Sequence, residues 1–208
     1  VITLEPMSPI QAGTVNLYSR EFYRLAESRL NKGGIMMQWL PLHLVNEDDA
    51  RSILKTFQKV FPHTSVWNSF LTRIVLLVGS KEPIVLDKIR FDSLTLIPEI
   101  RKAAQQIGVN SFLDFTDFFL TEGKHIKPLL KNAAIVTDDH PILEFSSATL
   151  LPPLKWQVDE IFLNFLKHRV EHYPQIRGLM PSEKRRWKKD FNTRTAQRLS
   201  VFSRRYHG

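Results

Sequence analysis

The sequence contains no cysteine among its 208 residues. Disulfide bonds, thiolate metal sites and cysteine nucleophiles are therefore excluded. The absence of cysteine fits a reducing compartment, and we expect a cytoplasmic location. The sequence also lacks apolar runs of bilayer length: the stretch IVLLVG at 74–79 is as long as a strand and far too short to cross a membrane as a helix.

Hydrophobic residues make up 43% of the chain and charged residues 24%, which is ordinary for a globular protein. The net charge of +8 is unevenly placed. Residues 155–208 contain 13 basic and 5 acidic residues, whereas residues 1–154 contain 16 of each. Because the basic character begins near the prolines at 152 and 153, we expect one domain over 1–150 and a basic, mostly helical extension over 151–208.

The spacing of apolar residues predicts alternating strands and helices. Strands are expected near 1–5, 35–39, 64–70 and 73–79, and helices near 17–31 and 47–61. Asn46 is expected to cap the second helix, with Asp49 at the capping-box position. A stretch with a polar centre, at 134–145, is expected to be a short strand or extended.

The order of these elements predicts an α/β fold. The first two strands are joined by a helix, so they should lie parallel with both faces covered. The last two strands are joined by Leu71 and Thr72 alone and should form an antiparallel hairpin. A parallel, Rossmann-type sheet that ends in such a hairpin is typical of methyltransferase-like folds.

Four stretches then suggest a family: LEPMSPIQAGTVNLYSREFY, LNKGGIMMQWLPLH, FQKVFPHTSVW and VTDDHPILEFS. Together they resemble the spermidine synthase family of aminopropyltransferases, and most closely its bacterial spermidine-synthase-like branch. The resemblance covers roughly residues 1–147. It implies a transferase of polyamine biosynthesis that uses decarboxylated S-adenosylmethionine, or S-adenosylmethionine itself, as donor and a small-molecule amine as acceptor.

The resemblance also implies roles for individual residues. Glu5 falls where the family has an aspartate that acts on the attacking amine, and Ser8 falls where the family has a second aspartate. Gln38, taken to end the second strand, matches a glutamine at the rim of the active site. The missing carboxylate at Ser8 puts the usual diamine substrate in doubt.

In this family the glycine-rich donor-binding loop precedes the strand that begins at Val1. The resemblance therefore implies that the chain is the C-terminal half of the catalytic domain, carrying the acceptor side and inactive alone. The strand at 1–5 should then lack one parallel neighbour, and an exposed strand edge favours self-association.

A carboxylate at the end of a parallel strand suits this chemistry. Alkylamines are protonated at neutral pH, with a pKa of about 10.4 for lysine-like groups, and only the neutral amine is a nucleophile. Glu5 could hold the cation and accept its proton, because open α/β sheets bind ligands at the carboxyl ends of their strands. The alternative is that Glu5 is a solvated carboxylate with no role.

Asp138 and Asp139, in the sequence TDDHP, are open to two interpretations. They form a turn before Pro141 whose side chains cap backbone amides, or one of them lines the acceptor pocket and replaces the charge missing at Ser8. A metal site is disfavoured because no partner ligands have suitable spacing. Tyr18 is a candidate for substrate contact, although core packing is the commoner role for such a residue.

The basic run EKRRWKKDF at 183–191 surrounds Trp187. Residues 181–208 could bind nucleic acid or an anionic membrane surface, but a solvated helical appendage is the favoured interpretation. Residues 159–173 should pack on the domain or on a partner. Three functions thus remain open: a transferase, a non-catalytic binding module of the same fold, and nucleic-acid binding through the tail.

Overall fold

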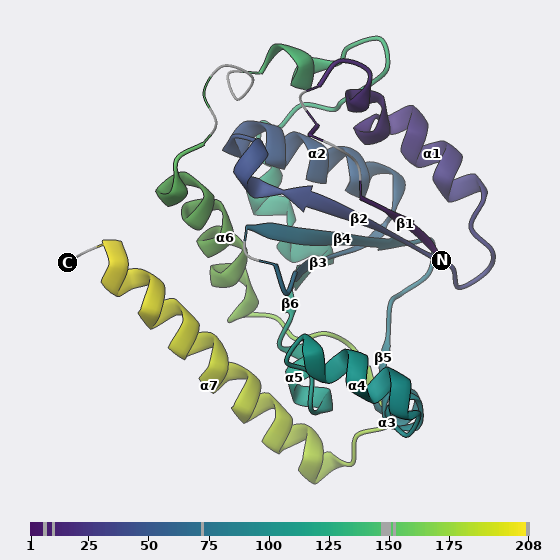
Figure 1. Cartoon of the computed structure of the whole chain (residues 1–208), viewed down its shortest axis with the longest axis vertical. Coiled ribbons are helices and arrows are strands. Elements are labelled where there is room, and N and C mark those ends of the chain that lie inside the picture. Colours follow the sequence, from purple (N-terminus) through teal and green to yellow (C-terminus); the bar gives the residue numbers. More distant parts are fainter. Residues whose placement is uncertain (6–7, 10, 72, 147–150, 152, 207–208) are drawn as a thin grey trace.

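The computed structural model describes residues 1–208 except 6–7, 10, 72, 147–150, 152 and 207–208 (Figure 1). The fold is mixed α/β. Among the described residues, a five-stranded sheet and a separate two-stranded sheet are accompanied by seven α-helices and several short 3-10 helices. No described helix is both long and apolar enough to cross a membrane.

The large sheet is mixed. Its spatial order is β1-β2-β4-β3-β6, with bounds Ile2–Leu4, Ile35–Pro41, Ile74–Ser80, His63–Asn68 and Phe119–Glu122. β1 and β2 are parallel, as predicted, and β3 and β4 form the predicted antiparallel hairpin. The pairings β2–β4 and β3–β6 are also antiparallel, so one pairing of the four is parallel in the described part of the sheet.

β1 lies at the edge of this sheet. It pairs with β2 over Ile2–Leu4 and has no second neighbour among the described strands.

The first two helices begin at well-defined caps. Before α1 (Arg20–Ser28), Ser19 is extended and its side chain accepts a hydrogen bond from the Phe22 amide. This cap separates α1 from a 3-10 helix, Thr14–Tyr18, so the predicted helix at 17–31 is shorter than expected. Before α2 (Glu47–Val60), Asn46 and Asp49 form the predicted capping box.

One face of the sheet packs against α1 and α2. The ring centroids of Tyr23 and Phe57 are 5.1 Å apart, and those of Phe57 and Phe61 are 4.7 Å apart. Gly79 on β4 lies directly beneath these rings, and a Cβ there would come within 2.6 Å of both phenylalanines. The helices can approach β4 this closely only because residue 79 has no side chain.

A second hydrophobic cluster contains Trp67 and Phe119 from the sheet, Phe112 from α5 (Phe112–Thr116), and Trp187 and Phe191 from α7 (Pro181–Tyr206). The short elements nearby are β5 (Leu86–Asp87), α3 (Lys88–Thr95), α4 (Pro98–Gln106), α5 (Phe112–Thr116) and β7 (Ile176–Arg177). Parallel pairing of β5 with β7 joins this region to the segment that leads into α7.

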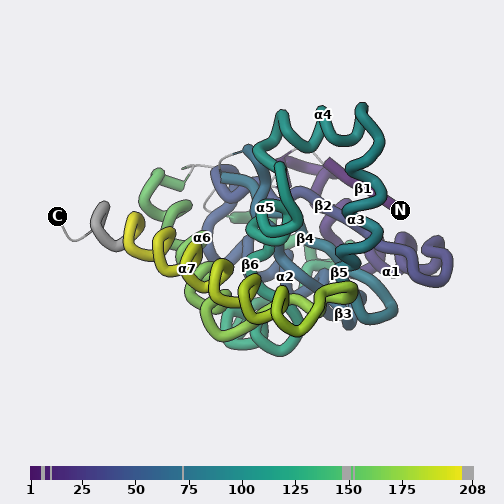
Figure 2. Tube along the Cα trace, turned by 90° about the horizontal axis from the view of Figure 1, so that it is seen from below, coloured from purple at the N-terminus to yellow at the C-terminus, as the bar shows by residue number. Residues whose placement is uncertain are grey.

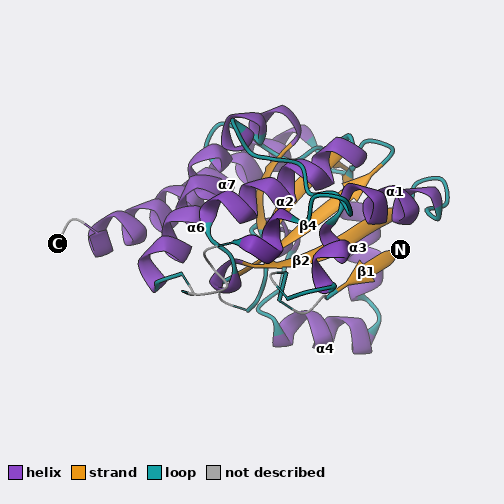
Figure 3. Cartoon of the chain, turned by 90° about the horizontal axis from the view of Figure 1, so that it is seen from above, coloured by secondary structure: helices purple, strands orange, loops and turns teal. Residues whose placement is uncertain are grey.

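The C-terminal helices, α6 (Lys155–Arg169) and α7 (Pro181–Tyr206), are packed against the rest of the protein (Figure 3). Ile161 and Leu166 of α6 lie in the main core. Trp187 is 7% exposed, and its indole N–H donates to Thr116 Oγ1 at 2.9 Å. The expectation that 181–208 is a solvated appendage is therefore wrong for the face of α7 that bears Trp187 and Phe191.

The stretch at 134–145 contains no strand of the large sheet. Thr137 and His140 form an isolated bridge that closes a tight turn, and a 3-10 helix follows at Ile142–Phe145. The remaining 3-10 helices are Leu42–Leu44, Gly123–His125 and Lys127–Leu130.

Candidate functional site

Glu5 lies just beyond the carboxyl end of β1, at the end of the sheet where the parallel strands β1 and β2 terminate. β1 ends at Leu4, and Glu5 follows directly with an exposed side chain. Ser8 is half-buried, and its carbonyl accepts a hydrogen bond from the Gln11 amide at 3.2 Å. Since β1 and β2 are parallel, this edge is also where β2 ends, as expected for the ligand-binding edge of a parallel pair.

A turn from the far end of the sequence packs against the start of α1. The Arg20 amide donates to Val136 O at 2.9 Å, and the Asp138 amide donates to Glu21 Oε2 at 3.1 Å. The bond from Asp138 and the Arg20 guanidinium help to lower the pKa of Glu21, although its limited burial acts the other way. The 137–140 turn is thereby fixed beside the start of α1.

Asp138 and Asp139 are both exposed within this turn. The turn itself was predicted, but the side chain that closes it is Thr137, whose Oγ1 accepts a hydrogen bond from the His140 amide at 3.1 Å. The two carboxylates form no ion pair within the described residues. Their oxygens are therefore available to attract a cation. In a turn-capping role they would instead be bound to backbone amides.

Gln38 does not end its strand. β2 continues to Pro41, so Gln38 lies in the middle, fully buried, with Nε2 donating to Leu17 O at 3.3 Å. The side-chain oxygen Oε1 of Gln38 and the Tyr23 hydroxyl have no hydrogen-bond partner within the described part of the chain. Burial raises the pKa of Tyr23 well above its ordinary value, and the Tyr18 hydroxyl beside it adds to this while Gln38 opposes it.

Tyr18 is likewise fully buried, and this burial raises the pKa of its hydroxyl. The structure therefore separates the predicted site residues into two groups. Tyr18 and Gln38 are interior, whereas Glu5, Ser8, Asp138 and Asp139 reach the surface in segments around the carboxyl end of β1 and the start of α1.

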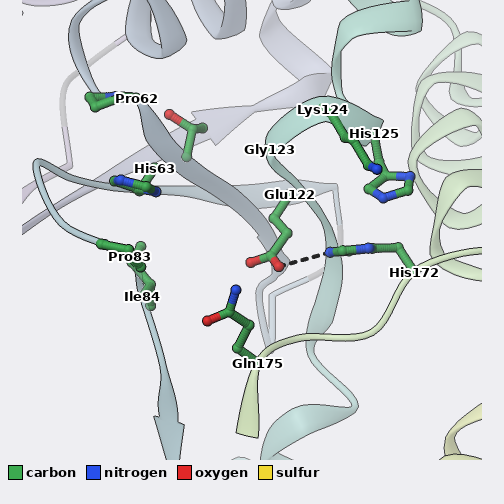
Figure 4. A pocket seen from close by; sticks show the side chains of 11 residues that line it. Pro62, His63, Pro83, Ile84, Glu122, Gly123, Lys124, His125, His172 and Gln175 are labelled. Atoms are coloured by element: carbon green, nitrogen blue, oxygen red, sulfur yellow. Dashed lines mark hydrogen bonds and ion pairs between the residues drawn. The ribbon is translucent and has the colours of Figure 1, made fainter.

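A pocket that the sequence did not predict lies at the opposite end of the strands, where β1 and β2 begin (Figure 4). Its volume is about 180 Å³, and it is lined by His63, Glu122, Lys124, His125, His172 and Gln175 among others. His63 pairs with the last residue of β4, and β2 begins beside the same residue, so the pocket is at the edge where β1 and β2 start. It is distinct from the edge that bears Glu5.

The pocket contains a histidine–carboxylate pair. His172 Nε2 and Glu122 Oε1 are 2.8 Å apart, and the His125 ring lies 3.9 Å from the His172 ring, centroid to centroid. Burial, followed by the neighbouring His172, lowers the pKa of His125. This pair can exchange protons with a small polar molecule. The hydroxyl of Thr64, which also lines the pocket, donates its proton to Phe61 O at 2.7 Å and so is not available as a donor to such a molecule.

A larger cavity of about 460 Å³ lies at the same edge of the sheet as Glu5, beyond the β3–β4 loop. Its lining includes Asn68 and Arg73 from the hairpin, Lys155 and Asp159 from α6, and Arg198 from α7. Lys155 and Asp159 form an ion pair at 2.6 Å. Basic side chains outnumber acidic ones here, so the cavity does not itself suit a cationic amine.

A scan against protein-family models and a search of curated proteins found no match to this chain. Within the described residues, no cluster of three or more histidines and carboxylates could hold a metal ion. The chemistry open to the protein therefore has to be judged from its carboxylates, its imidazoles and their places on the sheet.

Proposed function

We propose that this chain supplies the acceptor side of a spermidine-synthase-like aminopropyltransferase. The observation that carries the proposal is the position of Glu5, an exposed carboxylate immediately after β1 in the parallel pair β1–β2. There it can bind a protonated amine and then take up the proton that the amine must lose before it attacks.

The strand order supports the finer assignment of the fold. β4 returns antiparallel beside β2, and β3 lies outside it. This is the way in which methyltransferase-like sheets end, with a parallel part followed by a hairpin. In the proposed domain, β1 and β2 form the parallel part, and β3 and β4 form the hairpin.

The acidic groups at the start of α1 and in the 137–140 turn support an amine as the acceptor. Glu21, Asp138 and Asp139 lie in the contact between α1 and the 137–140 turn, and Glu144 accepts a hydrogen bond from the Gly13 amide at 3.1 Å. The carboxylates of Asp138 and Asp139 carry no ion pair within the described residues, so they can attract a polyamine.

The donor is not assigned to these residues. The eight glycines of the chain include no G-x-G sequence of the kind that holds a nucleotide between a strand and a helix. The residues present therefore do not fit S-adenosylmethionine or its decarboxylated form. We assign to this chain only the binding and deprotonation of the amine.

The test is the variant Glu5→Gln in protein expressed from the complete gene. Turnover of decarboxylated S-adenosylmethionine should be measured with putrescine and with longer amines. We expect a loss of about 10²–10⁴-fold, the usual contribution of a general base, with the fold retained. Glu99→Gln, a second exposed glutamate that lies on α4, is the matched control and should have full activity.

Ser8→Asp is the companion variant and should improve the use of diamines if Ser8 is what excludes them. Equal activity of wild type and Glu5→Gln would eliminate Glu5 as the base. If wild type consumes none of the amines, the transferase assignment fails and a non-catalytic module of the same fold becomes the better account.

A further inference from the structure

The helices α3 and α4 expose an unusual amount of apolar surface. Neither helix has a buried residue. Six large aliphatic side chains between 39% and 74% exposed lie on these helices, between them and just beyond α4: Ile89, Leu94, Leu96, Ile97, Ile100 and Ile107. Contiguous exposed apolar surface in a folded domain usually marks a site of interaction.

Exposed isoleucines lie at both ends and in the middle of α4. Ile100 is within the helix, Ile97 is the residue before it and Ile107 the residue after it, and all three are exposed. The charged residues of α4, among them Arg101 and Lys102, lie between them in the sequence and are also exposed. Isoleucine side chains are normally buried, yet these three are open to solvent.

Basic side chains gather at the same end of the molecule. Residues 177–190 contain six basic and two acidic residues, and the five from Lys184 to Lys189 on α7 are all exposed. β7 pairs with β5 directly before α3, and a Cβ on Gly178 would lie 2.8 Å from Ile89. Figure 1 shows α3, α4, α5 and the first turns of α7 at this end, and Figure 2 shows α4 on one side of it and the first turns of α7 on the other, with α3 and α5 between them.

Intramolecular partners occupy most of the acidic groups here. Asp92 pairs with Lys88 and Asp87 with Arg177, while the Glu183 carboxylate accepts a hydrogen bond from the Met180 amide at 2.8 Å. The exposed side chains of Lys184, Arg185 and Lys189 form no ion pair within the described residues. The end as a whole therefore presents both positive charge and aliphatic side chains.

We propose that this end, formed by α3, α4 and the first turns of α7, binds an anionic phospholipid surface. Aliphatic side chains of α3 and α4 would enter the boundary between headgroups and acyl chains, and the lysines and arginines would contact the lipid phosphates and serines. The proposal is independent of the transfer reaction.

A lipid surface accounts for these residues better than nucleic acid does. Trp187, the aromatic residue within the basic run, is buried against Phe191 at a centroid distance of 5.0 Å, so it is not available to stack on bases. Phosphate backbone would use the lysines and leave the six aliphatic side chains in water. A second copy of the chain would bring two positively charged ends together, which opposes self-association through this surface.

The test is sedimentation of the full chain with vesicles at about 0.1 M salt, near the ionic strength at which surface charges act over roughly 10 Å. Vesicles of phosphatidylcholine with 30% phosphatidylserine are compared with phosphatidylcholine alone. We expect binding to the mixed vesicles. Arg185→Gln with Lys189→Gln should weaken it about thirty-fold, since each basic side chain contributes on the order of five-fold.

Leu96→Ser tests the apolar part and should weaken binding about tenfold. Matched controls are Leu25→Ser, which removes an exposed leucine from α1, and Lys32→Gln, which removes an exposed lysine beyond α1; both should bind as wild type does. Circular dichroism of every variant should match wild type, because all the changed side chains are exposed.

Three results would overturn the proposal. The first is no binding to the mixed vesicles, or equal effects of the test and control variants. The second is binding to single- or double-stranded nucleic acid, without vesicle binding, that is lost in Arg185→Gln with Lys189→Gln. The third is a dimer that Leu96→Ser dissociates, again without vesicle binding.

Discussion

Replacing Asp117 with asparagine should destabilise the protein more than removing the buried arginine that Asp117 binds. The Arg169 side chain is fully buried, and its Nη2 donates to Asp117 Oδ1 at 2.7 Å. Its guanidinium lies 4.0 Å from the centre of the Phe191 ring, and Nε and Nη1 have no hydrogen-bond partner within the described residues. Among the described residues, Asp117 is therefore the one carboxylate that pairs with this guanidinium.

The two partners depend on each other unequally. Asp117 also pairs with Arg198 and lies 3.7 Å from Arg194. Without Arg169 it keeps two cations, whereas without Asp117 the guanidinium of Arg169 stays buried beside the charges of Arg194 and Arg198. Burial already lowers the pKa of Arg169 to about 10, and Asp117 acts against that change.

These contacts set the expected magnitudes. Removing one partner of a buried ion pair costs about 3–5 kcal/mol of unfolding free energy, and we expect this for Asp117→Asn. Arg169→Met keeps much of the volume and removes the buried charge, so its cost should stay below about 1.5 kcal/mol. Asp190→Asn breaks a longer ion pair, 3.9 Å from Arg186, and should cost less than about 1 kcal/mol.

Urea unfolding followed by circular dichroism and tryptophan fluorescence would measure all three variants. The slopes of the transitions should be alike, so that shifts of the midpoint report stability. If Arg169→Met destabilises the protein as much as Asp117→Asn or more, the unequal dependence inferred from the contacts is wrong.

Two further predictions concern the core and the pocket. Gly79→Ala should lower the free energy of unfolding by at least about 1–3 kcal/mol, since the new Cβ would lie 2.6 Å from Phe61 Cγ. Gly108→Ala is the control, because its Cβ meets open space and bears only the strain of a φ of +80°. Similar melting temperatures for the two variants would contradict this prediction. Because the pKa of His125 is lowered in the folded state, stability should fall as the pH drops below about 6.5, the unfolded value, and His125→Gln should flatten that dependence. Unfolding midpoints at several pH values test it, and identical profiles for wild type and variant would reject it.

Local patterns in the sequence were sufficient for the elements nearest the N-terminus. Asn46 and Asp49 are three residues apart, so their capping box can be recognised from residue type and spacing alone. The parallel pairing of β1 and β2 follows from the helix that joins them. Each of these features depends on residues close in the chain, which a single sequence displays directly.

Long-range pairing explains what the sequence did not reveal. The end of β2 is set by its ladder with β4, which continues to the pairing of Pro41 with Ile74 and leaves Gln38 in the interior. β6 was missed because its partner, β3, lies more than 50 residues earlier. The pocket at the other edge joins His63, Glu122 and His172, whose spacing carries no local signal.

The sequence of the C-terminal helix contains a pattern that predicts packing against the domain, but its high charge favoured a solvated helix instead. Trp187, Phe191 and Thr195 recur every four residues, and all three are buried. That spacing predicts a helix packed along one stripe. The basic residues between them favoured a solvated helix, but they occupy the outward face and say nothing about the inward one.

The exposure of Glu5 bears on its proposed role as the general base of the transferase. β1 has a free edge among the described strands, and Glu5 directly after it is exposed to solvent. A general base works best where little water surrounds it, because a desolvated carboxylate binds a proton more readily. In the proposed transferase, the bound amine would take the place of water around Glu5, so the carboxylate would accept the proton more readily once the acceptor is bound.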